Sequence, residues 1–278
     1  MIEQGKEHLV GYESHFKIEK DGHVGWLIMN RPEKRNVMDG GFFTGLPEAL
    51  SVLDDDPDVR VIVLRGAGKS FTAGLDLTWA GSLFTGGMGA DARELTRQNI
   101  MKLQESFSAV EKCKKPVIAA IHSHCIGGGI DLTCACDLRI ASADAVFSVR
   151  EVRLGIIADL GTLQRMPYLV GQTMFRELAF TGRDFGAEEA LKMGFITRIL
   201  PDQNSLLEEA KRLAGEIADL PPLAVQGIKE VLLFTRENGV NAGLQYVAQK
   251  NASALLSEDI MEAFTAFMQK RKPVFQGK

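Results

Sequence analysis

Short apolar runs alternate with helical patterns over the first half of the chain. Residues 15–20 alternate apolar and polar side chains, and residues 23–29 do so less cleanly on the other side of an Asp-Gly pair, which is typical of a β-hairpin. Residues 61–64 and 117–121 are uninterrupted apolar runs of the kind that is buried in parallel sheets. The pattern therefore predicts a hairpin followed by two buried strands.

Helices are predicted between the strands and throughout the chain after residue 140. Residues 40–53 have helical spacing, although a glycine and a proline weaken it. After an irregular loop over residues 78–90, a second helix is expected to begin with Asp91 as its cap. The remaining helices are expected over residues 162–170, 173–181, 187–193, 205–219, 222–235, 240–256 and 258–271.

Three consecutive glycines, Gly127 to Gly129, precede an apolar run that predicts a buried helix over residues 130–136. Glycine lets another atom approach the backbone closely, and the first N–H groups of a helix are free and partly positive. Such donors can hold a developing oxyanion. Asp131 lies in the first turn of this helix, and Glu151 and Asp159 follow in a mostly apolar stretch. The sequence thus predicts a site built from backbone donors and carboxylates.

The alternation of strands and helices indicates an α/β fold with right-handed βαβ units and a largely parallel sheet. The clearest helix breaker is the pair Pro221 and Pro222, which separates the last helices from the body. We expect residues 1–200 to form the α/β core and residues 201–278 to form a helical region that serves oligomerisation and pocket closure.

Composition and charge exclude several functions. The chain has 278 residues, of which 45% are hydrophobic, and 32 basic against 36 acidic residues give a net charge of −4. This balance provides no electrostatic footprint for nucleic acid. No apolar run has the length of a membrane span, the polar N-terminus does not resemble a signal peptide, and the C-terminus is no peroxisomal tripeptide. Cysteines within an apolar helix suit reduced thiols, so we expect a cytoplasmic location.

Familiar cofactor motifs are incomplete. Gly68, Lys69 and Ser70 follow a strand as in a phosphate loop, but Val63 occupies the position of the required first glycine. Leu132 replaces the third glycine of a dinucleotide fingerprint. The chain has no nucleophile elbow for serine hydrolysis. Neighbouring histidines and cysteines fit no standard zinc spacing, so no metal is expected at residues His122, His124, Cys125, Cys134 and Cys136.

Three ordered motifs carry a family resemblance. They are Phe-Thr-Ala-Gly-Leu-Asp-Leu at 71–77, His-Cys-Ile-Gly-Gly-Gly-Ile-Asp-Leu at 124–132 and Gly-Thr-Leu-Gln-Arg-Met-Pro at 161–167. Together they resemble the crotonase (enoyl-CoA hydratase/isomerase) superfamily, and the likeness extends from about residue 15 to the C-terminus. The resemblance implies a spiral of ββα units with a helical C-terminal trimerisation region, usually assembled as a dimer of trimers.

The resemblance also implies an acyl-CoA site. The backbone N–H groups of Leu75 and Gly128 would form an oxyanion hole that polarises the thioester carbonyl of the substrate. The same motif would supply further substrate-binding residues, Ala73, Gly74, Asp76 and Leu77. Basic residues, which as unaided sequence would be a solvated face, fall where the family places them near the CoA phosphates: Arg31, Lys34, Arg35 and Lys69.

The acids indicate which reaction of the superfamily applies. Its hydratases have glutamates at the positions of Asp131 and Glu151 and usually glycine at that of Asp159. The trio found here instead resembles the Δ3,5-Δ2,4-dienoyl-CoA isomerases of fatty-acid β-oxidation, which move a proton from C2 to C6 through a dienolate and need neither metal nor redox cofactor. By analogy with the hydratases, Glu151 would serve C2 and Asp159 would serve C6, with Asp131 as a supporting acid.

Each acid also has a structural interpretation. Asp159 could cap the helix expected at 162–170, Glu151 could form an exposed ion pair with a neighbouring arginine, and Asp131 could serve only its own helix dipole. Two other functions therefore stay open: a hydratase or monoene isomerase on the same fold, and a non-catalytic acyl-CoA-binding protein.

Overall fold

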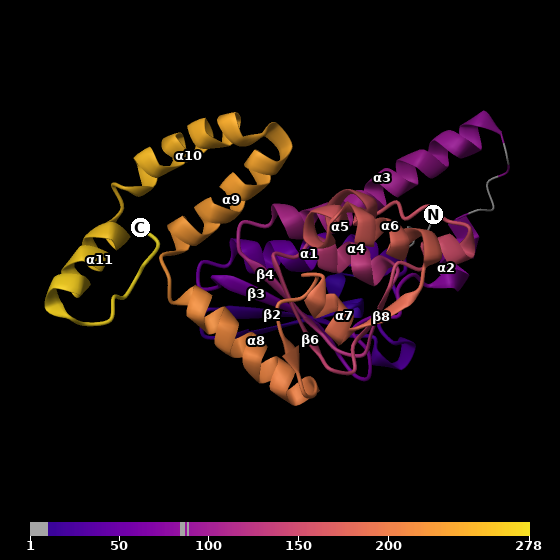
Figure 1. The fold of residues 1–278 in the computed structure, drawn as a ribbon, viewed down its shortest axis with the longest axis horizontal. Coiled ribbons are helices and arrows are strands. Elements are labelled where there is room, and N and C mark those ends of the chain that lie inside the picture. Colours follow the sequence, from indigo (N-terminus) through magenta and orange to yellow (C-terminus); the bar gives the residue numbers. More distant parts are fainter. Residues whose placement is uncertain (1–10, 84–86, 88) are drawn as a thin grey trace, which may run out of the picture.

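A six-stranded sheet forms the centre of the molecule (Figure 1). The computed structural model describes residues 11–83, 87 and 89–278. Strand β1 pairs antiparallel with β2, and every other neighbouring pair is parallel, as the sequence predicts. In spatial order the strands are β1 (Phe16–Asp21), β2 (Val24–Met29), β3 (Val61–Gly66), β4 (Val117–Ile121), β6 (Leu138–Ser142) and β9 (Ile199–Leu200).

Helices cover both faces of this sheet (Figure 1). Alternate side chains of β2 point to opposite faces, so Leu27 belongs to one apolar cluster and Trp26 to the other. The first cluster is closed by α1 (Gly40–Asp55), α3 (Ala90–Lys112) and α4 (Gly128–Cys134), and the second by α8 (Gln203–Ala218).

A second, three-stranded sheet lies beside the glycine run. Its strands are β5 (His124–Ile126), β7 (Val146–Ser148) and β8 (Asp184–Gly186). Phe147 stacks on Phe185 and meets Phe195 edge-on, which anchors the sheet in the core. The Gly127 N–H donates to the Ser148 carbonyl over 2.9 Å, so this sheet fixes the glycines that begin α4.

Three secondary-structure predictions are wrong. Part of the loop expected over 78–90 is helix α2 (Leu77–Leu83), because the Asp76 carboxylate accepts hydrogen bonds from the N–H groups of its first turn; positions 84–86 and 88 lie outside the described residues. Gly89, not Asp91, is the N-cap of α3. Strands β7 to β9 interrupt the region predicted as helical, and β6 extends two residues into it, since runs of two to five residues are too short to show alternation.

The other helices lie where the sequence predicts them, within a few residues. They are α5 (Thr162–Val170), α6 (Gln172–Thr181), α7 (Ala187–Lys192), α9 (Pro222–Asn238), α10 (Val240–Ala254) and α11 (Glu258–Gln269). The described residues also contain three 3₁₀ turns, η1 (Tyr12–Ser14), η2 (Pro32–Lys34) and η3 (Glu151–Leu154). None of the helices in the described part of the chain is long and apolar enough to cross a membrane.

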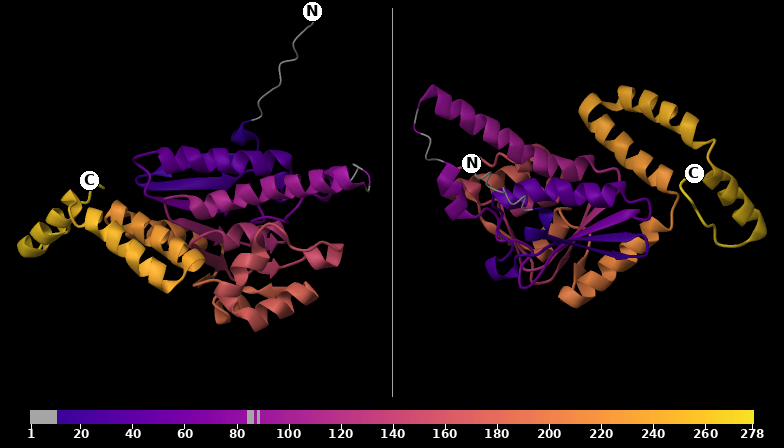
Figure 2. Two further views of the ribbon diagram at one scale, coloured as in Figure 1. Left: turned by 90° about the horizontal axis from the view of Figure 1, so that it is seen from above. Right: turned by 180° about the vertical axis from the view of Figure 1, so that it is seen from behind.

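Helices α9 to α11 form an arm that extends away from the body (Figure 2). Helix α8 is different, because its side chains Leu206, Ala210 and Ala214 are buried against the main sheet. A division of the chain at residue 200 would thus assign to the helical region one helix that packs on the core. The division itself stays a prediction.

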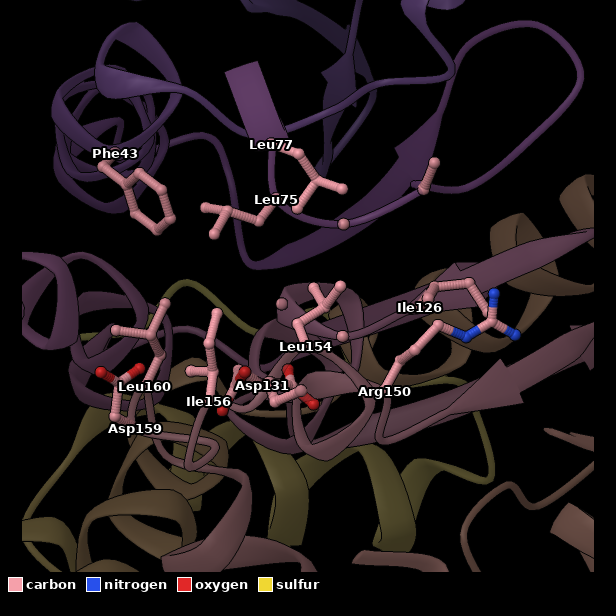
Figure 3. A pocket seen from close by; sticks show the side chains of 15 residues that line it. Phe43, Leu75, Leu77, Ile126, Asp131, Arg150, Leu154, Ile156, Asp159 and Leu160 are labelled. Carbon is pink, nitrogen blue, oxygen red and sulfur yellow. The ribbon is translucent and has the colours of Figure 1, made fainter. Parts of the chain in front are cut away.

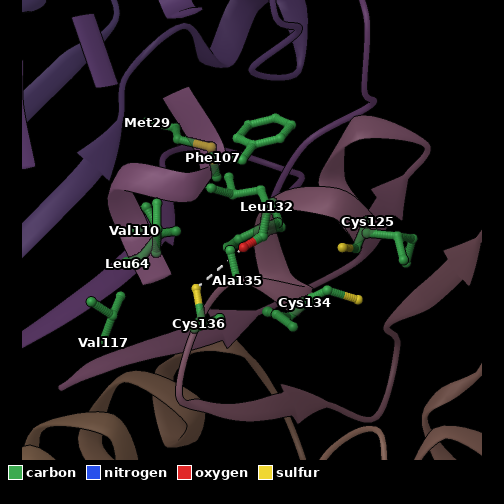
Figure 4. Packing of buried hydrophobic residues seen from close by; sticks show 14 of the residues in the cluster. Met29, Leu64, Phe107, Val110, Val117, Cys125, Leu132, Cys134, Ala135 and Cys136 are labelled. Atoms are coloured by element: carbon green, nitrogen blue, oxygen red, sulfur yellow. Dashed lines mark hydrogen bonds between the residues drawn. The ribbon is translucent and has the colours of Figure 1, made fainter. Parts of the chain in front are cut away.

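All four cysteine thiols are buried, and those of Cys125, Cys134 and Cys136 lie at and around α4 (Figure 4). Cys136 donates weakly to the Leu132 carbonyl, and burial raises the pKa of its thiol to about 12. No group of three or more metal-binding side chains occurs in the part of the chain that the structure describes. These thiols therefore pack as small apolar side chains.

A buried ion pair fastens the arm to the body. The Lys229 ammonium on α9 lies 2.7 Å from the Asp137 carboxylate and also donates to the carbonyls of Lys115 and Val110. The Lys229 side chain is 6% exposed and that of Asp137 29%. Asp137 also accepts the Val117 N–H at the start of β4.

We expect Lys229→Met to lower the free energy of unfolding by about 2–3 kcal/mol, because it leaves Asp137 without its cation. The loss stays below that of a fully buried pair, since Asp137 retains some solvent contact. Urea denaturation measures it. The matched control is Lys211→Met, whose pair with Asp21 is exposed (61% and 50%) and should cost under about 1 kcal/mol. Equal losses in the two variants would contradict the anchoring role.

Candidate active site

A cavity of about 260 Å³ lies between the segment that precedes α2 and the segment that follows β7 (Figure 3). It brings together the three predicted acids, both predicted oxyanion donors and three of the predicted substrate-binding residues. Its wall consists of Phe43, Ala73, Gly74, Leu75, Leu77, Ile126, Gly127, Gly128, Asp131, Arg150, Glu151, Leu154, Ile156, Asp159 and Leu160.

Two free backbone donors lie on one wall of the cavity. Gly74 has a φ of +86°, and a Cβ there would lie 2.5 Å from the Ile126 carbonyl and 3.7 Å from the Gly128 nitrogen. Glycine therefore lets this segment approach the start of α4. Among the described residues, neither the Leu75 N–H nor the Gly128 N–H donates to a protein acceptor. Both remain available to a ligand.

Asn36 holds this segment in place, and the sequence analysis missed it. Its buried amide donates to the carbonyls of Ala67, Ser70 and Phe71. The Thr72 hydroxyl donates to the Asn36 carbonyl and accepts the Gly74 N–H over 3.0 Å. Asn36 itself has a φ of +53°, which asparagine tolerates better than most residues. The sequence feature that could have indicated this structural role is an asparagine in a short loop.

Glu151 presents a largely buried and unpaired carboxyl group to the cavity. Its Oε2 atom has no hydrogen-bond partner within the described part of the chain, and Oε1 lies 3.2 Å from where a Cβ on Gly127 would be. Burial, followed by the charges of Asp131 and Asp159, raises the pKa of Glu151 to about 7. The alternative interpretation of Glu151 as part of an exposed ion pair is wrong, because its side chain is largely buried and Arg150 pairs with Asp184 instead.

Asp131 is the most deeply buried of the three acids, with 1% exposure. Its Oδ1 accepts the Thr162 N–H over 2.6 Å, which satisfies the first turn of α5. Burial raises the pKa of Asp131 to about 6, while the bonds from Thr162 oppose the rise. The interpretation that Asp131 serves only its own helix dipole is therefore wrong, since this carboxylate joins α4 to α5.

Asp159 lines one end of the cavity, and its carboxyl group lies apart from that of Asp131 (Figure 3). It does not cap α5, whose N-cap is Gly161 and whose Thr162 N–H is taken by Asp131. Burial raises the pKa of Asp159. The alternative interpretation of Asp159 as a helix cap is wrong.

The four basic residues predicted for CoA binding lie outside the cavity wall and differ from one another. The Arg31 guanidinium is held by Asp39 and by His15 Nε2, and its side chain is 14% exposed. The side chains of Lys34, Arg35 and Lys69 are exposed. Their role in binding stays a prediction.

The α/β spiral fold, the two free backbone N–H donors and the buried acids beside them together indicate the class of protein to which this chain belongs. The chain belongs to the enoyl-CoA hydratase/isomerase family, whose profile matches residues 19–278. A solved enoyl-CoA hydratase from Bacillus anthracis has a TM-score of 0.87 and 32% identity, covering 95% of this chain and 100% of its own. The predicted superfamily and fold are confirmed.

The identities to individual members of the family indicate which kind of enzyme the chain resembles. The chain is 47% identical over 259 residues to the peroxisomal Δ3,5-Δ2,4-dienoyl-CoA isomerase of Arabidopsis thaliana, covering 92% of this chain and 93% of the relative. It is 43% identical over 264 residues to the mitochondrial protein of that name from Mus musculus, covering 94% and 81%. The resemblance to these isomerases is confirmed.

The predicted cytoplasmic location is contradicted by the same relatives. Their names place the Arabidopsis protein in peroxisomes and the mouse and human proteins in mitochondria. The prediction depended on reduced cysteines and on the absence of leader sequences. Buried thiols packed as small apolar side chains carry no information about the compartment.

We expect Glu151→Gln to stabilise the fold at pH 8 by up to about 3 kcal/mol, because the folded protein no longer has to ionise a buried carboxyl group. A raised pKa favours the folded state at low pH, and this contribution is lost as the pH rises from about 4.5 to about 7. The gain should therefore disappear at pH 4.5. Thermal unfolding of both proteins across this range measures it.

Glu208→Gln is the matched control, since Glu208 is exposed on α8. It should change the free energy of unfolding by less than about 0.5 kcal/mol at either pH. A Glu151→Gln variant that is no more stable than the wild type at pH 8 would contradict the burial argument.

Proposed function

We propose that this protein is an isomerase that converts a 3,5-dienoyl-CoA into the 2,4-dienoyl-CoA in fatty-acid β-oxidation. Relatives named as this isomerase are 40–47% identical over most of the chain. The observation that carries the proposal is that Glu151 and Asp159 line one cavity beside two backbone donors, and that within the described residues neither acid forms an ion pair and neither donor has an acceptor.

The reaction moves a proton along the substrate without net oxidation. The thioester carbonyl accepts hydrogen bonds from the Leu75 and Gly128 N–H groups. A carboxylate at Glu151 removes a proton from C2, and the electron pair spreads over a dienolate whose charge lies partly on the thioester oxygen. Asp159, protonated, delivers a proton to C6, which leaves double bonds at C2–C3 and C4–C5. Each oxyanion donor typically lowers the barrier by ~3 kcal/mol.

The two catalytic carboxyl groups must begin in opposite protonation states. Burial raises the pKa of Glu151 to about 7 and also raises that of Asp159, so each group keeps its proton to a higher pH than a free carboxyl group does. Because carboxylates that share a site disfavour each other's ionisation, one charged and one neutral member is the preferred state of the pair. Asp131 adds negative potential and fixes α5 behind them.

The coenzyme A moiety of the substrate supplies phosphates that require cations. Lys34 and Arg35 lie on the η2 loop, which Asn36 ties to the loop that carries Lys69. The Arg35 carbonyl accepts the Ala73 N–H, so this loop adjoins the cavity wall. We assign the phosphate contacts to these three exposed cations, with Arg31 holding the loop through Asp39. The proton shift balances without metal or redox cofactor.

Hydration of an enoyl-CoA is the second candidate function. A crotonyl-CoA hydratase from Syntrophomonas wolfei is 32% identical over 262 residues. Asp131 and Glu151 occupy the positions of the hydratase acids, and both line the cavity. The hydrogen bond that the Thr162 N–H donates to Asp131 disfavours this function, because it occupies one oxygen of a carboxylate that would have to position water.

We expect Glu151→Gln and Asp159→Asn each to lower kcat for 3,5-dienoyl-CoA by about 10²–10⁴-fold, because each removes one proton-transfer group. Formation of the conjugated 2,4-dienoyl-CoA is followed by its ultraviolet absorbance. Circular dichroism should show both variants folded. The wild type should hydrate crotonyl-CoA far more slowly than it isomerises the diene. Fast hydration, with Asp159→Asn fully active, would replace the isomerase by the hydratase.

We propose that the protein self-associates as a trimer, or as a dimer of trimers, and the surface of the arm supports self-association. Its helices carry large apolar side chains that the isolated chain leaves exposed, including Phe264 at 66%, Phe267 at 80% and Met268 at 79%. Exposed apolar area of this kind marks an interface. The arm's position away from the body makes its faces accessible to another copy (Figure 2).

We expect Phe267→Asp to shift the sedimentation coefficient toward that of the monomer, because a charge would be buried at the interface. Analytical ultracentrifugation at micromolar concentration measures the change. Lys270→Asp, an exposed change just after α11, is the control. A wild type that sediments as a monomer would contradict the assembly.

A further inference from the structure

The main chain at Asp159 lies in a segment without regular structure. Residues 155–161 connect η3 to α5 and form neither helix nor strand. The Asp159 carboxyl group accepts no hydrogen bond from another side chain of the described residues. Its direction must therefore depend on how its own backbone is held.

Gln104, on α3, supplies that hold. Its side-chain amide donates to the Asp159 carbonyl oxygen over 2.7 Å. Gln104 is half-buried, whereas its neighbours Phe107 and Val110 belong to the core. A polar residue at this edge of the core face makes one directed contact, and that contact is with the backbone of Asp159.

The same face of α3 also holds the next part of the segment. Ser108 and Glu111 follow Gln104 by four and seven positions, which places the three on one side of the helix. Both accept hydrogen bonds from Arg165 Nη2, over 3.1 and 3.0 Å. Arg165 Nη1 lies 3.4 Å from the Leu160 carbonyl. Helix α3 thus fixes consecutive carbonyl groups at residues 159 and 160.

We propose that Gln104 is a positioning residue that directs the Asp159 carboxyl group toward C6 of the substrate. The inference rests on the proposed isomerase function. Without the amide donor, the Asp159 carbonyl has no protein partner among the described residues, and the loop is free to shift. A shift of about 1 Å at a reacting group can cost about 10²-fold in rate.

The test is Gln104→Leu, which preserves much of the side-chain volume but removes the donor. We expect kcat for 3,5-dienoyl-CoA to fall roughly ten- to hundredfold, with KM changed by less than about threefold because binding at the carbonyl end is intact. Gln98→Leu is the matched control, because Gln98 is exposed on the same helix and its side-chain amide donates to Glu94, its one side-chain partner within the described residues. It should leave kcat and KM unchanged.

A deuterium experiment separates positioning from general damage. In D₂O, a dienolate that forms but is not protonated at C6 returns to substrate with deuterium at C2. Gln104→Leu should therefore raise the ratio of C2-deuterated substrate to isomerised product relative to the wild type. Mass spectrometry and NMR of the recovered thioesters measure this ratio. A general loss of folded enzyme lowers both quantities together and leaves the ratio unchanged.

The outcomes distinguish this inference from the proposed function. If the wild type does not isomerise 3,5-dienoyl-CoA, the proposed function fails, and this inference fails with it. If the wild type isomerises and Gln104→Leu retains wild-type kcat, or loses kcat with an unchanged deuterium ratio, the positioning role alone is overturned. A fall in kcat with a raised ratio, absent from Gln98→Leu, supports it.

Discussion

Close approach of backbones at glycine is the constraint on which the site depends. A Cβ at Gly74 would collide with the Ile126 carbonyl, and one at Gly129 would lie 2.6 Å from Thr72 Cγ2. At Gly127, with a φ of +54°, it would press on the Glu151 carboxyl group. These contacts let three segments meet around one cavity with two N–H groups still free. Larger residues would separate the donors from the acids.

Where these segments meet, two of the three buried acids differ in their hydrogen bonding. Asp131 is satisfied by the Thr162 N–H and contributes to the junction of α4 and α5. Glu151 keeps an unpaired oxygen in a largely apolar surrounding, which disfavours its charged form. The fold therefore tolerates a destabilising group where proton transfer needs one, and the large apolar cores on both sides of the sheet offset that cost.

The sequence revealed the parts of the site that have local signals. The glycine run, the acids after it and the parallel strands could be predicted because each depends on residue type and short spacing. Asn36 and Gln104 could not, since their partners lie 31 to 35 and 55 positions away. The glycines within residues 78–90, one of which lies inside α2, predict a loop after Asp76, although the capping carboxylate of Asp76 was a usable signal for a helix.

Helix α3 connects the site to the arm. The Glu111 carboxylate accepts hydrogen bonds from Arg165 and from Arg236 on α9. Arg165 also contacts the carbonyl of Leu160, the residue after Asp159. Its pKa is lowered, because the two guanidinium groups outweigh the effect of burial. Lys229, also on α9, donates to the carbonyl of Val110, the residue before Glu111. The end of α3 is therefore bonded to the arm through both Arg236 and Lys229. The geometry at Asp159 and the direction of the arm therefore share one rigid element.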